Sequence, residues 1–118
     1  MKRHNFKKLQ IWSDSMELID ATYKMTKTFP DYEKFGLVSQ MNRCAVSIAS
    51  NIAEGTSKST DKHFLKYLEN SLGSAFEWET QLIVCKRQNY IEKEMFTDLE
   101  KQVTRLQSKI SNFMNRFE

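Results

Sequence analysis

Glycine and proline are scarce in this chain, and their scarcity bears on the fold class. The 118 residues include three glycines and one proline, whereas β folds need such residues at their many tight turns. A turn-rich β fold is therefore not expected. The chain has the length of one domain, and 40% hydrophobic residues are enough for one core. We expect a single domain spanning residues 1–118.

Histidine is equally scarce, which argues against several kinds of catalytic site. The di-iron sites of helical bundles need two Glu-x-x-His motifs, but Met1 and Thr60 stand three residues before His4 and His63. Two histidines also make a hydrolytic zinc centre a poor expectation. Neither a phosphate-binding glycine loop nor a nucleophile elbow occurs in the sequence. We expect no enzymatic activity, no metal site and no cofactor.

The chain also lacks long hydrophobic runs and a cysteine framework. No run approaches the ~18 apolar residues of a membrane span, and no apolar segment follows the basic start as it does in a signal peptide. Cys44 and Cys85 are too few for a disulfide scaffold and fit a reducing compartment as free thiols. We expect a cytoplasmic protein without a membrane partner.

What the sequence does contain is helical periodicity. Apolar residues recur every three or four positions over residues 9–27, 32–54, 60–88 and 92–116, which predicts four amphipathic helices. The expected core positions are Leu9, Trp12, Met16, Ile19, Tyr23, Thr26, Val38, Met41, Ala45, Ile48, Ile52, Phe64, Leu68, Leu72, Ala75, Phe76, Leu82, Ile83, Met95, Leu99, Val103, Leu106, Ile110, Phe113 and Phe117.

The breaks between these segments carry recognisable start and stop signals. Pro30 ends the first helix, and Asp31 is a plausible N-cap of the second. Gly55 is expected to adopt the left-handed conformation that closes a helix, and Thr60 or Asp61 to cap the third. Short loops between long helices predict an all-α, antiparallel up-down-up-down four-helix bundle.

This topology predicts the state of the thiols. In an antiparallel hairpin Cys44 lies level with about residue 71, which is fourteen residues from Cys85 along the third helix. At 1.5 Å per residue the two are roughly 20 Å apart, well beyond the ~7 Å that a disulfide spans between Cα atoms. Both thiols should therefore be free.

Basic residues gather in two places. The formal charge is +3, and the basic N-terminal arm of about residues 1–8 contributes +4 without an acid, which leaves −1 for the rest. A second group follows the second helix. Both are candidate phosphate contacts, although short basic tails are often merely solvated. The candidate nucleic-acid-binding residues are Lys2, Arg3, Lys7, Lys8, Lys58, Lys62 and Lys66.

A polar stripe lies opposite the apolar stripe of the second helix, with a counterpart in Asn70, Ser74, Glu77 and Gln81 of the third. Exposed helix faces usually favour Lys and Glu, whereas most of these residues are short and neutral. We interpret the stripe as a subunit interface or buried polar network, with Arg43 level with Glu77 for an ion pair; the alternative is a solvated face. The set is Gln40, Arg43, Ser47, Asn51, Glu54, Glu77 and Glu79.

Several of these residues also form recognisable motifs. The motifs comprise Phe6, Leu9, Trp12, Phe29-Pro30, Gln40, Arg43, Ser47-Ile48, Asn51-Ile52-Ala53-Glu54-Gly55 and Gly73-Ser74-x-x-Glu77-x-Glu79-Thr80-Gln81-Leu82. In them the chain resembles the bacterial four helix bundle protein family, also called the 23S rRNA intervening-sequence protein family. The similarity spans about residues 6–110. Cys44 and Ala49 depart from it, because alanine or proline is frequent at those positions.

The resemblance implies a homopentamer of four-helix protomers with no known catalytic residues. Members of the family are encoded in inserted segments of large-subunit ribosomal RNA genes or elsewhere in bacterial genomes. A similar fold serves as the accessory protein of diversity-generating retroelements, where it binds reverse transcriptase and nucleic acid. The resemblance thus implies an oligomer associated with RNA or with a nucleic-acid-processing protein.

Two functions follow as hypotheses. The first is a non-enzymatic oligomeric binding module for structured RNA or another nucleic acid. The second is a protein-interaction scaffold whose partner is another protein. Phosphate contacts release counterions, so an affinity that falls with salt would favour the first hypothesis.

Overall fold

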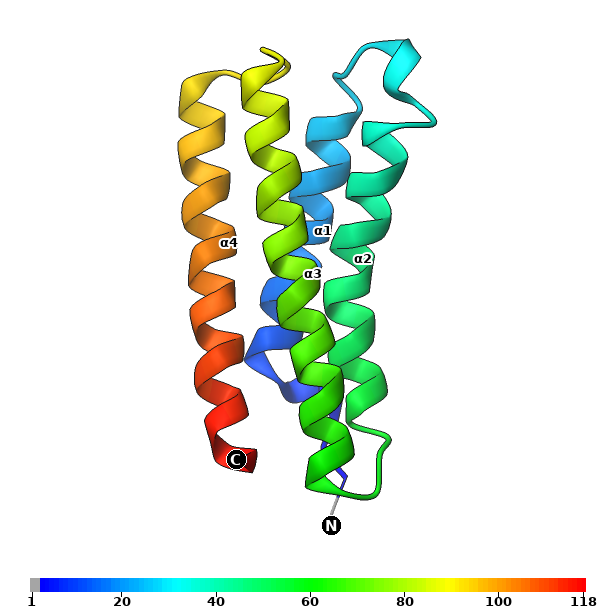
Figure 1. Cartoon of the computed structure of the whole chain (residues 1–118), viewed down its shortest axis with the longest axis vertical. Coiled ribbons are helices and arrows are strands. Elements are labelled where there is room, and N and C mark those ends of the chain that lie inside the picture. Colours follow the sequence, from blue (N-terminus) through cyan, green and yellow to red (C-terminus); the bar gives the residue numbers. More distant parts are fainter. Residues whose placement is uncertain (1–2) are drawn as a thin grey trace.

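Four long helices make up the fold in the computed structural model, which describes residues 3–118; Lys2 therefore lies outside the described residues. They are α1 (Gln10–Thr26), α2 (Leu37–Gly55), α3 (Asp61–Arg87) and α4 (Lys93–Met114). Three 3-10 turns, η1 (Phe6–Lys8), η2 (Asp31–Glu33) and η3 (Asn115–Phe117), flank them. Successive helices run in opposite directions (Figure 1), which confirms the predicted all-α, up-down-up-down four-helix bundle.

The core extends along the bundle and receives side chains from every helix. Trp78 of α3 is the largest fully buried side chain, and its indole Nε1–H donates to Thr22 Oγ1 of α1 over 3.1 Å. The Thr22 hydroxyl in turn donates to the Leu18 carbonyl over 2.6 Å. The indole and the hydroxyl are therefore buried without losing their hydrogen bonds, as interior polar groups require.

The predicted core stripe of α1 is wrong at two positions. Met16 and Tyr23 are exposed, whereas Ser15 and Thr22 are fully buried. Burial is possible because each hydroxyl donates to the carbonyl four residues earlier, over 2.7 Å for Ser15 and 2.6 Å for Thr22. The core face of α1 is thereby rotated by about one residue from the stripe that apolar residues alone predict.

The predictions for Phe76, Ile83 and Met95 are also wrong, because all three are exposed. In α3 the central core row steps by three or four residues through Phe64, Leu68, Ser71, Ala75, Trp78, Leu82 and Cys85, and Gln81 is buried beside this row. A residue directly after such a position points to the flank of the helix rather than into the core. Phe76 follows Ala75, and Ile83 follows Leu82.

The helix ends differ in part from the prediction. Helix α2 begins at Leu37 rather than near residue 32, and Asp31 opens the η2 turn instead of capping α2. Glu33 takes the capping role, because its Oε1 accepts from the Leu37 N–H over 3.2 Å. Thr60 caps α3 as predicted and accepts the His63 N–H over 3.2 Å.

Gly55 does not adopt the predicted left-handed conformation, since no glycine among residues 3–118 has a positive φ. Gly55 instead allows α2 and α3 to approach each other closely. A Cβ at residue 55 would lie 2.8 Å from Phe64 Cδ1 and 2.9 Å from Tyr67 Cβ. Small residues continue this approach along α2 and α3, where the Ser71 hydroxyl donates to the Ile48 carbonyl over 2.7 Å. The α2–α3 register agrees with the hairpin prediction.

The thiols are free and buried, as predicted. Burial raises the pKa of both Cys44 and Cys85 to about 12, and the nearby Glu77 carboxylate adds to the effect at Cys44. The Cys44 Sγ lies 3.1 Å from the Ser74 carbonyl oxygen, to which it donates. Neither sulfur has the character of an activated nucleophile, which would need a lowered pKa.

Candidate nucleic-acid interface

One end of the bundle brings together the N-terminal segment, the α2–α3 loop, the start of α3 and the end of α4 (Figure 1). The Arg3 Nε–H donates to the Ser57 carbonyl of the α2–α3 loop over 2.8 Å. This contact places the first predicted basic cluster beside the second. We call this surface the basic pole, and its members are Arg3, Lys7, Lys8, Lys58, Lys62, Lys66, Lys109 and Arg116.

The N-terminal segment is anchored on the bundle rather than extended from it as an arm. The His4 ring packs against Phe64 of α3 and Phe117 of η3, with ring centroids 5.2 and 5.9 Å away. The Phe6 ring packs against Trp12, with centroids 5.3 Å apart. Aromatic packing therefore holds the described part of the basic N-terminal arm, residues 3–8, against the bundle. Lys7 and Lys8 nevertheless remain exposed.

The second cluster lies on the loop and on the first turns of α3. The Lys58 ammonium lies 4.8 Å from the Tyr67 ring centroid, a cation–π arrangement that leaves the side chain half-buried. Lys62 and Lys66 are exposed and four residues apart, hence on one face of the helix. The two predicted clusters thus form one surface.

Sequence reasoning missed the contribution of α4 to this surface. Lys8 shares the lining of a cavity of about 420 Å³ with Lys109 and Arg116, between the start of α1 and the end of α4. The cavity floor includes Leu9 and Ile11. The contribution of α4 could have been predicted, because the up-down topology places the end of the fourth helix beside the start of the first.

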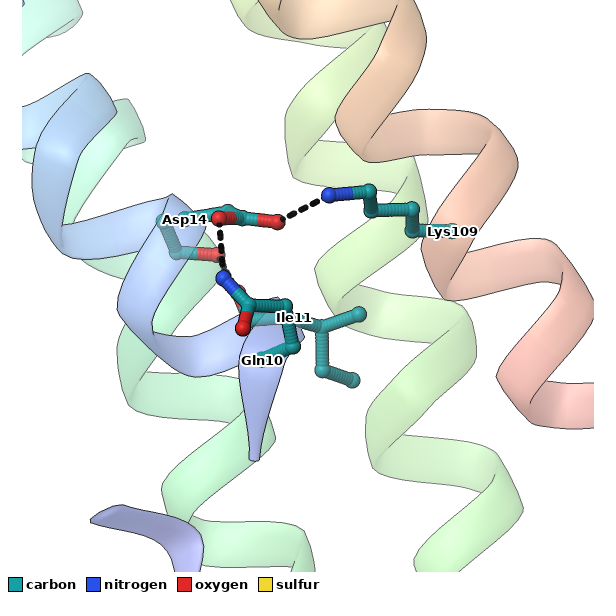
Figure 2. Close-up of polar contacts among 5 residues, drawn as sticks. Gln10, Ile11, Asp14 and Lys109 are labelled. Carbon is teal, nitrogen blue, oxygen red and sulfur yellow. Dashed lines mark hydrogen bonds and ion pairs between the residues drawn. The ribbon is translucent and has the colours of Figure 1, made fainter. Parts of the chain in front are cut away.

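Lys109 is the one pole cation that is paired with a carboxylate in the part of the chain described. Its Nζ lies 2.9 Å from Asp14 Oδ2, and Gln10 Nε2 donates to the other carboxylate oxygen over 2.8 Å (Figure 2). The pair links α1 to α4, and over residues 3–118 it is the sole ion pair. The unpaired acids at the pole are Glu54, Asp61 and Glu118, so basic charge prevails there.

The polar stripe lies along the outer groove between α2 and α3. Arg43 and Glu77 share the lining of a cavity of about 240 Å³, so they are level as predicted. Neither takes part in an ion pair within residues 3–118. Deeper in the groove, the Ser47 and Ser74 hydroxyls lie 3.0 Å apart, and Asn51 Nδ2 donates to the Ser47 carbonyl over 2.9 Å.

The exposed residues of the stripe are Gln40, Arg43, Glu54 and Glu77, while Ser47 and Asn51 are half-buried. Glu79 does not belong with them. Its Oε1 accepts from Gln107 Nε2 over 2.9 Å, which directs it toward α4 instead of α2. The stripe and Glu79 therefore lie on different sides of α3.

Gln81 adds an unsatisfied acceptor to the Glu77 side of the groove. Its Nε2 donates to Glu77 Oε2 over 3.2 Å, but its Oε1 is buried and has no partner. A buried acceptor without a donor is unfavourable by ~1–3 kcal/mol.

The described residues offer neither a metal-binding group of side chains nor a membrane-crossing helix. From Arg3 to Glu118 no three side chains of histidine, cysteine, aspartate or glutamate are grouped so as to hold a metal ion. Over the same residues, none of the helices has the length and apolar character needed to cross a membrane.

Comparison with known proteins adds evidence of descent and fold. A family model described as 23S rRNA-intervening sequence protein matches residues 7–112. A solved structure from Bacteroides thetaiotaomicron, described as a protein of unknown function from the S23 ribosomal protein family, shares the fold with a TM-score of 0.81. It is 23% identical, and the alignment covers 88% of this chain and 97% of that one. No curated protein matches. Because the family model spans nearly the whole chain, the protein belongs to the 23S rRNA-intervening sequence protein family.

Proposed function

We propose that this protein is a non-enzymatic, oligomeric module of the cytoplasm that binds structured RNA through its basic pole. The observation that carries the proposal is the convergence of cations from three separate segments on one end of the bundle. Apart from Lys109, they have no carboxylate partner in the described chain. Lys2 belongs to the same proposal as a further candidate contact.

Cations without a carboxylate partner are available to bind the phosphates of a nucleic-acid backbone. Each phosphate that Lys or Arg neutralises releases counterions, so affinity grows with the number of contacts and falls with salt. At the pole, Arg3 and Lys58 are held by a hydrogen bond and a ring, whereas Lys7, Lys8, Lys62 and Lys66 are exposed. Such a surface reads backbone charge and shape rather than base sequence.

The oligomeric part of the proposal is supported by the polar stripe. The Arg43 guanidinium is exposed and takes part in no ion pair within residues 3–118, so a second copy that covers the groove would supply its partner. Several poles in one assembly would also bind one RNA with greater avidity than a single pole.

A comparison of salt dependence tests the RNA-binding part. The triple variant Arg3→Ala, Lys7→Ala, Lys8→Ala is compared with a control that removes as many cations from the opposite end, Lys27→Ala, Arg87→Ala, Lys93→Ala. For a structured RNA hairpin, each lost contact should flatten the slope of log affinity against log salt by about 0.7–0.9. The pole variant should bind more weakly with a flatter slope, and the control should match the parent.

Equal affinities and slopes for parent and pole variant would contradict the proposal. That result would favour the second function, a scaffold that binds another protein. A specific observation favours it: Phe76, Ile83 and Val84 leave an apolar flank of α3 exposed, with Phe76 at 52%. Salt-insensitive capture of one defined protein, lost in Phe76→Ala, would support that function.

A further inference from the structure

The connection between α1 and α2 presents an aromatic tip at the end of the bundle opposite the basic pole (Figure 1). Phe35 is 90% exposed and Tyr32 is 78% exposed, which makes them the two most exposed large hydrophobic residues described. We call residues 32–35 the knob. The free energy of such an apolar surface is lower when a partner covers it and removes it from water.

The knob is held in position rather than loose. The Glu33 carboxylate accepts the Tyr90 hydroxyl over 2.8 Å and the Leu37 N–H over 3.2 Å. The Tyr90 ring packs on Phe29, with centroids 5.2 Å apart. These contacts fix the residues beside Phe35, and a fixed tip loses little conformational freedom when it binds.

A cavity of matching character lies between the end of α1 and the start of α4. Its volume is about 430 Å³, and its apolar lining comprises Ala21, Met25, Met95 and Leu99. We call this cavity the socket. Met95 is 42% exposed at its edge. Methionine is flexible and makes favourable contacts with aromatic rings, so this lining suits an inserted phenyl group.

The charges around the two features are complementary. The socket is bordered by Glu92, Glu94 and Asp98, against a single cation, Lys24. The knob carries Lys34, whose ammonium lies 5.5 Å from the Phe35 ring and would enter the acidic border with it. Complementary charge around an apolar contact fixes orientation and suppresses wrong partners.

Knob and socket of one chain do not meet, because Phe35 stays exposed while the socket lies on the α1–α4 side. The knob directly precedes α2, at the end of the bundle where α1 and α2 connect. The α1–α4 side is the opposite side of a bundle in which α2 packs on α3. A contact between unlike patches of identical chains is heterologous and builds a ring when its rotation closes.

We propose that the knob of one copy inserts into the socket of the next, with Phe35 among the methionines and Lys34 at the acidic border. The inference rests on the oligomer of the proposed function and names the contact that builds it. The partner is a second copy of this chain.

Complementation of two variants tests the proposal. Phe35→Asp removes the knob, and Met95→Lys blocks the socket and repels Lys34. Each variant alone should lose the oligomeric native mass, with self-association at least ~30-fold weaker, as for a central interface anchor. Mixed together, they should form a heterodimer, because the intact knob of the Met95→Lys chain meets the intact socket of the Phe35→Asp chain. Phe76→Asp, which removes an exposed aromatic residue elsewhere, should keep the parent mass.

A charge exchange provides the second arm. Lys34→Glu should weaken assembly, and Glu94→Lys in the same chain should restore it. An oligomeric parent whose mass is unchanged by Phe35→Asp would overturn this contact alone and leave the oligomer to other surfaces. A monomeric parent at micromolar concentration would overturn both the contact and the oligomeric part of the proposed function. RNA binding at the pole would still be judged separately, by its salt slope.

Discussion

Two glycines within helices should respond to alanine with opposite signs. In a helix interior, glycine is less favourable than alanine by ~0.8–1 kcal/mol, and neither Gly55 nor Gly73 has a positive φ that would require glycine. At Gly73 of α3 an added Cβ meets nothing within 4 Å. Gly73→Ala should therefore stabilise the protein by about 0.8–1 kcal/mol.

At Gly55 there is too little space for the methyl group of alanine. The new methyl group would lie 2.8 Å from the ring of the fully buried Phe64 and 2.9 Å from Tyr67 Cβ, which is fixed to the α3 backbone. Overpacking of this kind costs ~1–3 kcal/mol. Because Gly55 is the last residue of α2, the propensity gain there is at most ~1 kcal/mol, and after its subtraction Gly55→Ala should be destabilised by up to about 2 kcal/mol.

Urea unfolding of parent, Gly55→Ala and Gly73→Ala measures both values. All three are compared at one protein concentration, because assembly adds to apparent stability, and their native masses are checked. The informative quantity is the difference between the two variants, about 1–3 kcal/mol, since propensity largely cancels in it. Similar stabilisation of both would refute the close α2–α3 approach at Gly55.

Four further predictions concern buried polar groups, the thiols and the stripe. Thr22→Val should destabilise by about 1–3 kcal/mol, because the Trp78 Nε1–H loses its acceptor; Thr22→Ser, which keeps the hydroxyl, should lose clearly less in the same urea assay. The raised pKa of about 12 at Cys44 and Cys85 predicts slow reaction with a disulfide reagent at pH 8 until the chain unfolds. Above about pH 9 the unfolded chain loses thiol protons that the folded chain keeps, so unfolding free energy should fall toward pH 12, and less so in a Cys44→Ala, Cys85→Ala variant. Arg43→Ala should lower the stability of the assembly by about 3–5 kcal/mol if a partner copy buries its charge; a change within ~0.5 kcal/mol and an unchanged native mass would remove the stripe as an interface.

Much of the fold could be predicted from the sequence, because helix periodicity and loop length depend on local chemistry. The core of α2 is where this worked best: Met41, Ala45, Ile48 and Ile52 are all fully buried as expected. The prediction failed in α1 because hydroxyl groups bonded to their own helix can replace apolar residues in a core. The spacing of apolar residues alone does not reveal such bonds.

The candidate site was predictable only in part. The two lysine-rich clusters could be read from the sequence, but they lie side by side because of contacts between distant residues, such as the Arg3 hydrogen bond to the Ser57 carbonyl and the packing of His4 on Phe64. Lys109 and Arg116 were missed because they are spaced like ordinary charges on the outer face of a helix. The knob was not predicted, because Phe35 was expected to lie inside a helix that begins near residue 32. Its exposure follows from the later start of α2.

Ultraviolet cross-linking to a structured RNA hairpin, with the modified peptides identified by mass spectrometry, tests the central claim most directly. The parent protein is cross-linked at low salt and again at high salt, where phosphate contacts weaken. RNA binding at the basic pole predicts cross-links in peptides covering residues 3–8, 57–67 and 109–117, all fading as salt rises. Cross-links confined to the knob end, or none at low salt, would contradict RNA binding at the basic pole.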